Sequence, residues 1–283
     1  MDATDTAAIR ADLLRRWASA ASGWGKRASR IREMGMPVST RMIELLALQP
    51  GERVLELAAG PGDTGFFAAE MIRPGGTLIS SDAAEPMLDI ARERARQLEI
   101  DNVEFKLLEL EWIDLPTASV DAVLCRWALM LVVDPAAALA EMRRVLRPGG
   151  RLAVAVWDAP EHNPWATIPT RALVSLGHAE PPDPQAPGMF ALAGAGRLEE
   201  LLRSAGFVEA QVESVEIGRW HESVSAYIAE TLDLSRAFAD VYERLSDDDR
   251  AAVNAEIGSL AGAYSDGETL ALPGRSLVAI AGA

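Results

Sequence analysis

The sequence predicts one α/β domain built on a parallel β-sheet, with helical additions. Three observations support this fold class. Short apolar runs alternate with helical segments between residues 50 and 157, which is typical of βαβ units. A Gly-rich turn joins the first apolar run to the helix after it. An Arg-Pro-Gly-Gly turn precedes both the second and the fifth runs.

The N-terminal segment, residues 1–48, has the pattern of helices. Apolar residues recur four apart on one face, at Ile9, Leu13 and Trp17. We expect a break at Gly23–Gly25 and a second helix near 38–48. Ser39 or Thr40 is available as its N-cap, and Pro50–Gly51 would stop it.

The predicted strands of the core follow in order. They are Arg53–Leu57, Thr77–Ser81, Val103–Leu107, Val120–Cys125 and Arg151–Val156. Residues 158–194 interrupt the alternation with many prolines and one helix near 166–177, as a lid or binding loop would. Beyond them we expect a helix at 196–205, a strand near 207–216, helices within 222–264 and a last strand at Ser276–Ala281.

Composition excludes several classes of function. The formal net charge is −15 and the basic residues are scattered, which argues against binding to nucleic acid or to an anionic membrane. Cys125 is the only cysteine, so no intramolecular disulfide can form, and we expect a cytoplasmic protein. The N-terminus has no apolar core of a secretory signal, and no stretch is apolar enough for a membrane span. The three histidines do not have metal-ligand spacing, so we expect no metal site.

The Gly-rich turn is the most specific feature of the sequence. Gly60, Gly62 and Gly65 satisfy G-x-G-x-x-G between a strand and a helix, where the backbone can approach a ligand closely. Asp82 ends the second strand 20 residues after Gly62, so it can accept hydrogen bonds from ribose hydroxyls. These features fit either a nicotinamide dinucleotide or S-adenosylmethionine. Glu56 favours the second, because a carboxylate suits a methionine ammonium and repels a diphosphate.

The run VLELAAGPGDTG resembles motif I of class I methyltransferases. SSDAAEPMLDIARERA is similar to their second motif, and the segment from Val103 to Trp157 is similar to the remaining ones. The flanks resemble the small-molecule branch of ubiquinone and menaquinone biosynthesis type. The resemblance implies a Rossmann-like, seven-stranded, mostly parallel sheet with helices on both faces and helical cap insertions. It also implies that the last strand inserts antiparallel beside the fifth.

The resemblance assigns cofactor-binding residues by position, with S-adenosylhomocysteine as the product. The loop around the methionine moiety corresponds to Glu56, Ala58, Gly60 and Gly62, with Ala58 replacing the usual first glycine. Asp82 corresponds to the ribose acid, and Ala83 and Met87 to positions that line the adenosine. Glu111 and Trp112 correspond to the pair that meets adenine, and Arg126 to the position beside the methionine moiety.

The sulfonium makes the methyl group electrophilic without help, so the protein needs no dedicated base. His162, just after the fifth strand, is the candidate general base, and an exposed loop histidine is the alternative. Residues suited to an apolar acceptor pocket, or alternatively to core packing, are Trp127, Met130, Trp157, Trp165 and Phe190. In this family N-terminal segments such as the one carrying Trp17 and Trp24 often fold over the cofactor.

We therefore expect a methyltransferase that moves a methyl group from S-adenosylmethionine to an oxygen, carbon or nitrogen atom of a small, partly apolar acceptor. Two alternatives stay open: an NAD(P)-dependent oxidoreductase, and a non-catalytic S-adenosylmethionine-binding protein. As one domain, residues 1–283 would comprise N-terminal helices (1–48), a cofactor-binding core (50–157) and cap insertions (158–194 and 222–264).

Overall fold

The computed structural model describes residues 3–183, 186–267 and 269–283. Within them lies one seven-stranded sheet with the strand order β3-β2-β1-β4-β5-β7-β6. Neighbouring strands from β3 to β5 are parallel, whereas β7 is antiparallel to both β5 and β6. The predicted mostly parallel sheet is confirmed, including the last strand beside the fifth. The strands are β1 (Arg53–Leu57), β2 (Thr77–Asp82), β3 (Val103–Leu107), β4 (Val120–Arg126), β5 (Leu146–Trp157), β6 (Val208–His221) and β7 (Leu270–Gly282).

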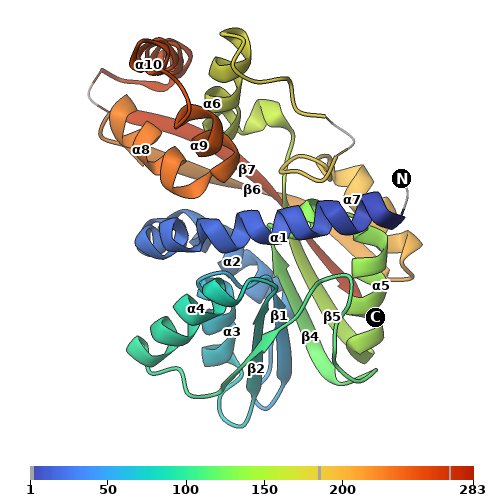
Figure 1. Cartoon of the computed structure of the whole chain (residues 1–283). Coiled ribbons are helices and arrows are strands. Elements are labelled where there is room, and N and C mark those ends of the chain that lie inside the picture. Colours follow the sequence, from blue (N-terminus) through green and yellow to red (C-terminus); the bar gives the residue numbers. More distant parts are fainter. Residues whose placement is uncertain (1–2, 184–185, 268) are drawn as a thin grey trace.

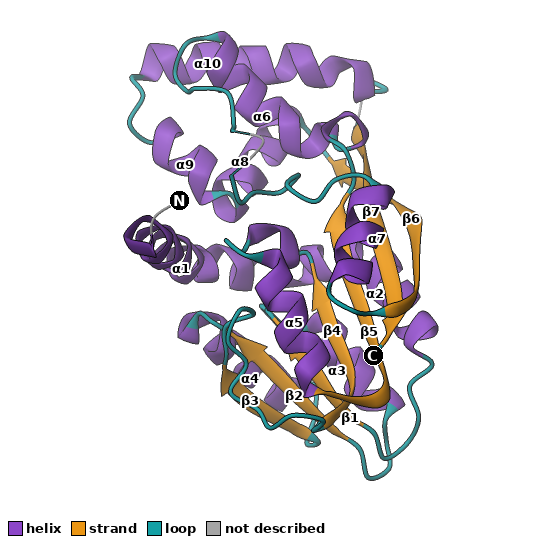
Figure 2. Cartoon of the chain, turned by 90° about the vertical axis from the view of Figure 1, so that its right-hand side faces the viewer, coloured by secondary structure: helices purple, strands orange, loops and turns teal. Residues whose placement is uncertain are grey.

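Helices cover both faces of the sheet (Figure 2), which explains why its central strands are buried along nearly their whole length and mostly apolar. From β1 the chain steps one way along the sheet to β2 and β3, and later the other way from β4 to β5. Right-handed crossovers therefore put α3 and α4 on one face and α5 on the other. The helices are α3 (Asp63–Met71), α4 (Glu85–Gln97), α5 (Pro135–Val145) and, before β6, α7 (Ala195–Ser204).

The N-terminal helices differ from the prediction. Helix α1 (Ala3–Lys26) continues through both glycines, and the break falls at Arg27, before α2 (Ala28–Leu46). The predicted break at Gly23–Gly25 is wrong because these glycines permit close packing. A Cβ atom on Gly23 would lie 1.9 Å from the carbonyl oxygen of Asp233.

The predicted N-cap of the second helix is wrong as well. Ser39 lies inside α2, which begins 11 residues before it, and its hydroxyl is 2.9 Å from that of Thr64 on α3. The pair ties α2 to the helix that follows the Gly-rich turn. The helix ends at Leu46, followed by Ala47 in the left-handed conformation.

Beyond the sheet, a second group of helices packs on the extended ends of β6 and β7 (Figure 1). These strands are longer than predicted, and β7 begins at Leu270 rather than Ser276. The added length carries a separate hydrophobic core that includes Ile168, Tyr227 and Leu272. Its elements are η2 (Pro160–His162), α6 (Pro164–Ser175), α8 (Val224–Leu234), α9 (Arg236–Tyr242), α10 (Asp247–Ala261) and η3 (Gly262–Tyr264).

Helix α1 runs between this helical group and the sheet domain (Figure 1). It packs on α4 below and on α8 above. Lys26 and Arg27, at its C-terminal end, both pair with Asp233 of α8. No helix in the described part of the chain has the length and hydrophobicity to cross a membrane.

Candidate functional site

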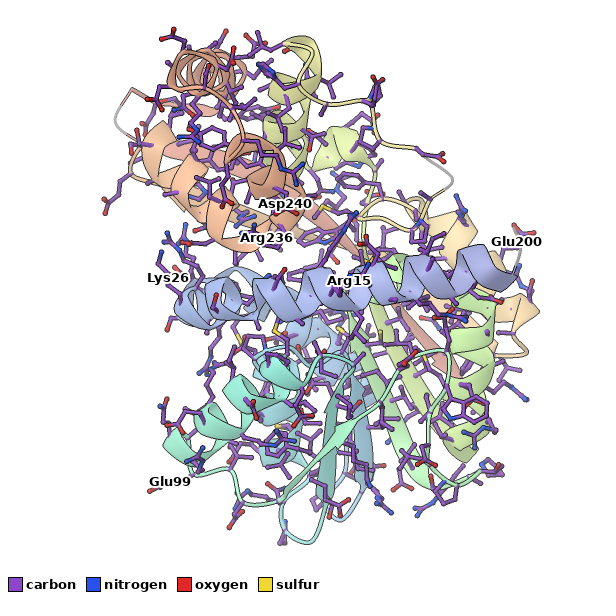
Figure 3. All side chains as sticks on the ribbon, viewed as in Figure 1. Arg15, Lys26, Glu99, Glu200, Arg236 and Asp240 are labelled. Carbon is purple, nitrogen blue, oxygen red and sulfur yellow. The ribbon has the colours of Figure 1, made fainter. Side chains whose placement is uncertain are left out.

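A pocket opens at the carboxyl ends of β1, β2 and β4, where the strand order reverses and doubly wound sheets bind ligands. Helix α1 passes over it, and Arg15 and Lys26 mark the course of that helix in Figure 3. Eight of the predicted cofactor residues line the pocket: Glu56, Ala58, Gly60, Asp82, Ala83, Met87, Glu111 and Arg126. Gly62, Trp112 and His162 do not contribute to the lining.

The Gly-rich turn that leads into α3 contains three residues in the left-handed backbone conformation. Ala58, Gly60 and Gly62 have φ values of 50°, 53° and 89°. An alanine in this region costs about 1–2 kcal/mol, so Ala58 strains the loop in place of the usual glycine. Gly62 is the N-cap of α3, and a Cβ atom there would lie 2.5 Å from the ring of Phe66. Gly62 therefore allows the tight turn into α3 and the close contact with Phe66, and it does not line the pocket.

Glu56 is the penultimate residue of β1, and its carboxylate is buried. Its Oε1 accepts a 2.7 Å hydrogen bond from the backbone N–H of Gly65, and its Oε2 accepts from the hydroxyl of Ser80 at 3.3 Å. Burial raises the pKa of Glu56 to about 7, although the Gly65 hydrogen bond and the charge of Arg126 oppose the shift. A carboxylate held this way gains from any cation that enters the pocket.

Asp82 closes the next strand and is 8% exposed. Its Oδ2 accepts from the N–H of Gly60 at 3.0 Å, and its Oδ1 accepts from the N–H of Ala84 at 2.9 Å. Burial raises its pKa, while these backbone hydrogen bonds favour the ionised form. Each carboxylate oxygen can accept a further hydrogen bond, so the side chain suits a pair of ribose hydroxyls.

The loop after β3 holds two acid–apolar pairs in succession, Glu109-Leu110 and Glu111-Trp112. The resemblance assigns the second pair to adenine, but Glu109 and Leu110 also line the pocket. Trp112 is 76% exposed, and its backbone N–H bonds to the carbonyl of Glu109 at 3.3 Å. Because the two pairs have the same acid–apolar pattern and lie two residues apart, the local sequence does not indicate which of them faces the pocket.

The carboxylate of Glu111 is already occupied by protein groups. Its Oε1 accepts from the backbone N–H of Asp134 at 2.8 Å and from Arg10 Nη2 at 2.8 Å. Its Oε2 accepts from Arg10 Nε at 3.1 Å. Glu111 thus ties α1 to the N-cap of α5 across the mouth of the pocket.

Helix α1 supplies a wall of the pocket, as the resemblance led us to expect for the segment that carries Trp17 and Trp24. Leu13, Leu14, Trp17 and Trp24 join Arg10 in the lining. The rings of Trp17 and Trp24 meet edge to face, with centroids 5.7 Å apart, and pack in a cluster with Met87. The sequence feature that indicates this wall is the apolar face of α1, and the structure turns that face toward the pocket.

Of the predicted acceptor aromatics, Trp127 lines the pocket. Its indole N–H donates to Ser276 at 2.9 Å, and its ring stacks on Trp157 with centroids 4.2 Å apart. Trp165 continues the row with an edge contact to Trp157 at 4.8 Å. Trp157, Trp165, Met130 and Phe190 do not contribute to the pocket lining. The row leads from the pocket into the helical group above the sheet.

His162 lies away from the pocket lining, in η2. Its Nδ1 is 2.8 Å from Asp158 Oδ2, and its Nε2 is 3.2 Å from Arg275 Nη1. Because arginine can only donate, Nε2 accepts and the proton sits on Nδ1, facing Asp158. The role of His162 as a base stays a prediction. In the described ranges, no three His, Cys, Asp or Glu residues cluster as metal ligands.

Known proteins share sequence and fold with this chain. The family model for a methyltransferase domain matches residues 48–177. Nocamycin O-methyltransferase of Saccharothrix syringae is 31% identical over 234 residues, covering 80% of this chain and 83% of that protein. A ubiquinone/menaquinone biosynthesis C-methyltransferase of Teredinibacter turnerae is 32% identical over 43% of this chain, which spans 49% of that relative.

The fold is shared with a solved methyltransferase structure. It is phosphoethanolamine N-methyltransferase 2 of Haemonchus contortus in complex with S-adenosyl-L-methionine, with a TM-score of 0.53 at 16% identity. The match covers 86% of this chain and 51% of that one. At this identity the likeness concerns the fold.

Proposed function

Because the chain belongs to the S-adenosylmethionine-dependent methyltransferases, we propose that the pocket beneath α1 holds this cofactor and opens toward a small, partly apolar methyl acceptor. The enzyme transfers the cofactor's methyl group to a small molecule and leaves S-adenosylhomocysteine. Family membership sets aside the oxidoreductase alternative. The acceptor atom, oxygen, carbon or nitrogen, is for an acceptor screen to identify.

The observation that carries the pocket assignment is the row of buried or pocket-facing acids along the strand ends. Glu56 is the penultimate residue of β1, Asp82 ends β2 and Glu109 follows β3. In this assignment Glu56 holds the ammonium, Asp82 the ribose hydroxyls and Glu109 the exocyclic amine of adenine. All three partners are hydrogen-bond donors, which carboxylates match.

The adenine assignment departs from the sequence prediction. We assign the edge of adenine to the Glu109 carboxylate and the Leu110 backbone N–H, in place of Glu111 and Trp112. The support is that Arg10 and the Asp134 N–H take up the oxygens of Glu111. Ala83 and Met87, which line the same end, would pack on the nucleoside.

When bound, the cofactor supplies an electrophilic methyl group, so the protein's contribution is mainly placement. Helix α1 excludes water from above through Trp17 and Trp24, and Trp127 walls the strand-end side. Both walls are apolar, which suits an apolar acceptor. We assign the segments 158–194 and 222–264 to a cap on the acceptor side. The expectations of a cytoplasmic location and of no nucleic-acid partner stay predictions.

Titration calorimetry with S-adenosylhomocysteine tests the pocket assignment, with NADH run beside it. We expect micromolar binding of S-adenosylhomocysteine alone. Asp82→Asn should weaken it about tenfold to hundredfold, since it disturbs charge-assisted hydrogen bonds to ribose. Asp89→Asn, on the exposed side of α4, is the matched control and should bind like the wild type. Equal affinity of wild type and Asp82→Asn would refute the ribose assignment.

A further inference from the structure

Arg126, the last residue of β4, is a cation without a protein partner at the pocket wall. Its guanidinium lies over the ring of Trp127, 4.6 Å from the centroid, and its Nη1 is buried with no hydrogen-bond partner. Across the described residues no ion pair or hydrogen bond joins this guanidinium to another group. A buried cation in this state is unfavourable unless something else supplies the counter-charge.

The fold makes room for this unpartnered cation. Gly35 lies in the interior of α2, where glycine is less favourable than alanine. A Cβ atom on Gly35 would stand 1.8 Å from Arg126 Nη1, so a larger residue here would displace the guanidinium from its present position. Glycine at this position therefore lowers the stability of α2 and leaves space for the guanidinium of Arg126.

Glu56, on the neighbouring strand β1, has a matching arrangement. A Cβ atom on Gly65, inside α3, would stand 2.0 Å from Glu56 Oε2. Two helical glycines therefore accommodate two buried groups of opposite charge that line one pocket. The charge of Asp63 and, less strongly, that of Glu56 favour the ionised form of Arg126, yet no ion pair joins the guanidinium to either carboxylate. Such spacing leaves room for a ligand that carries both charges, or for two ligands that carry one each.

We propose that Arg126 is the binding group for a carboxylate that a ligand brings into this pocket. The inference rests on the proposed function and extends it by naming the ligand's chemistry. Two ligands are candidate sources of the carboxylate: the amino-acid end of the cofactor, whose ammonium would face Glu56, and the acceptor. Both sources are open because Arg126 lines the cofactor pocket, and Trp127 beside it begins the aromatic row toward the cap.

The first arm compares two ligands that differ only at the amino-acid end. S-adenosylhomocysteine carries the carboxylate, whereas 5′-methylthioadenosine lacks it. If the cofactor is the source, Arg126→Met weakens S-adenosylhomocysteine about tenfold to hundredfold and changes 5′-methylthioadenosine less than twofold. Gly35→Ala, which displaces the guanidinium and keeps the charge, should weaken the same ligand alone. Arg15→Met, on exposed α1 surface, is the control and should change neither.

The second arm uses the protein saturated with S-adenosylhomocysteine. Binding of 3-phenylpropionate is compared with binding of its amide, which has the same shape and no charge. If the acceptor is the source, the wild type prefers the acid about tenfold or more and Arg126→Met loses this preference. In that case Arg126→Met leaves the affinity for S-adenosylhomocysteine unchanged.

Stability separates a binding role from a structural one. Replacing an unpartnered buried cation by methionine should raise the thermal midpoint of the free protein, because no native ion pair is broken. Arg126→Lys, which keeps the charge, serves if the methionine variant does not fold. A lowered midpoint with unchanged binding in both arms would overturn the proposal. Failure of the wild type to bind either nucleoside would instead refute the proposed function.

Discussion

Binding of S-adenosylhomocysteine should strengthen as pH rises from 6 to 8, because Glu56 must ionise to hold an ammonium. Burial raises the pKa of Glu56 to about 7 in the free protein, against 4.5 for an unperturbed side chain. The ligand ammonium keeps its proton throughout this range. Below pH 7 the ligand therefore meets a protonated carboxyl group, which must release its proton before the ion pair forms.

The size of the effect follows from the pKa. At pH 6, about one molecule in eleven carries ionised Glu56, and at pH 8 about ten in eleven do. The apparent dissociation constant should be about tenfold larger at pH 6 than at pH 8. Binding at pH 6 should also release close to one proton per ligand.

The contribution of Glu56 to the free energy of unfolding should fall as pH rises, whereas ligand affinity should increase. Between pH 4.5 and 7 the unfolded chain has lost this proton while the folded protein keeps it, so the group lowers folding stability as pH rises. Above pH 7 the loss is complete and amounts to about 3 kcal/mol. Glu56→Gln removes the titration and should be more stable than the wild type at pH 8, with little difference at pH 4.5.

Calorimetry in two buffers of different ionisation enthalpy gives both the affinity and the proton count. Urea unfolding of wild type and Glu56→Gln at pH 5 and pH 8 gives the stability difference. Affinity that is flat from pH 6 to 8 in the wild type would refute the reasoning. So would an equal pH dependence in Glu56→Gln, because the titrating group would then lie elsewhere.

Three further predictions concern packing and charge. Gly65→Ala should abolish measurable S-adenosylhomocysteine binding by displacing the buried acid beside it. Gly258→Ala, on α10, would place its Cβ atom in ordinary contact with Val224 at 3.8 Å, and should leave binding unchanged and raise stability by up to about 1 kcal/mol. Arg10→Gln should speed ligand release about twofold to fivefold in stopped-flow tryptophan fluorescence, since it breaks a partly exposed ion pair across the pocket mouth; an equal effect of Arg15→Gln would contradict this. Glu230→Gln should lower the free energy of unfolding by about 3–5 kcal/mol, because its buried arginine partner loses its counter-charge, and an unchanged urea midpoint would contradict that.

The sheet could be predicted from the sequence because each of its first five strands contains a short, mostly apolar run, although β5 begins at Leu146 rather than at the predicted Arg151. β1 and β3 have the predicted bounds, and β2 and β4 extend one residue further. Local signals decide such strands, since burial on both faces demands continuous apolar residues. The β6–β7 extension was underestimated because it leaves the sheet and alternates buried with exposed positions.

The features that the structure leads us to assign differently depend on contacts between residues far apart in sequence. Gly23 resembles a helix stop, but its role comes from Asp233, 210 residues later. Glu111 resembles an adenine acid, but Arg10, 101 residues earlier, occupies it. The sequence contains both partners without indicating that they meet. Local patterns thus located the pocket, and only the tertiary contacts show that Arg10 bonds to Glu111, which is why we propose Glu109 as the adenine acid.

The pocket wall concentrates features that make the fold less stable. Ala58 and Trp127 are both left-handed without being glycine, and both line the pocket. Glu56 holds a raised pKa, and Arg126 lacks a partner. Each departs from what folding alone favours, and strain of this kind persists where a ligand later compensates for it. S-adenosylhomocysteine at a hundredfold excess over its dissociation constant should therefore raise the unfolding free energy of the wild type by about 2.7 kcal/mol. At the same ligand concentration Glu56→Gln should show much less of this stabilisation.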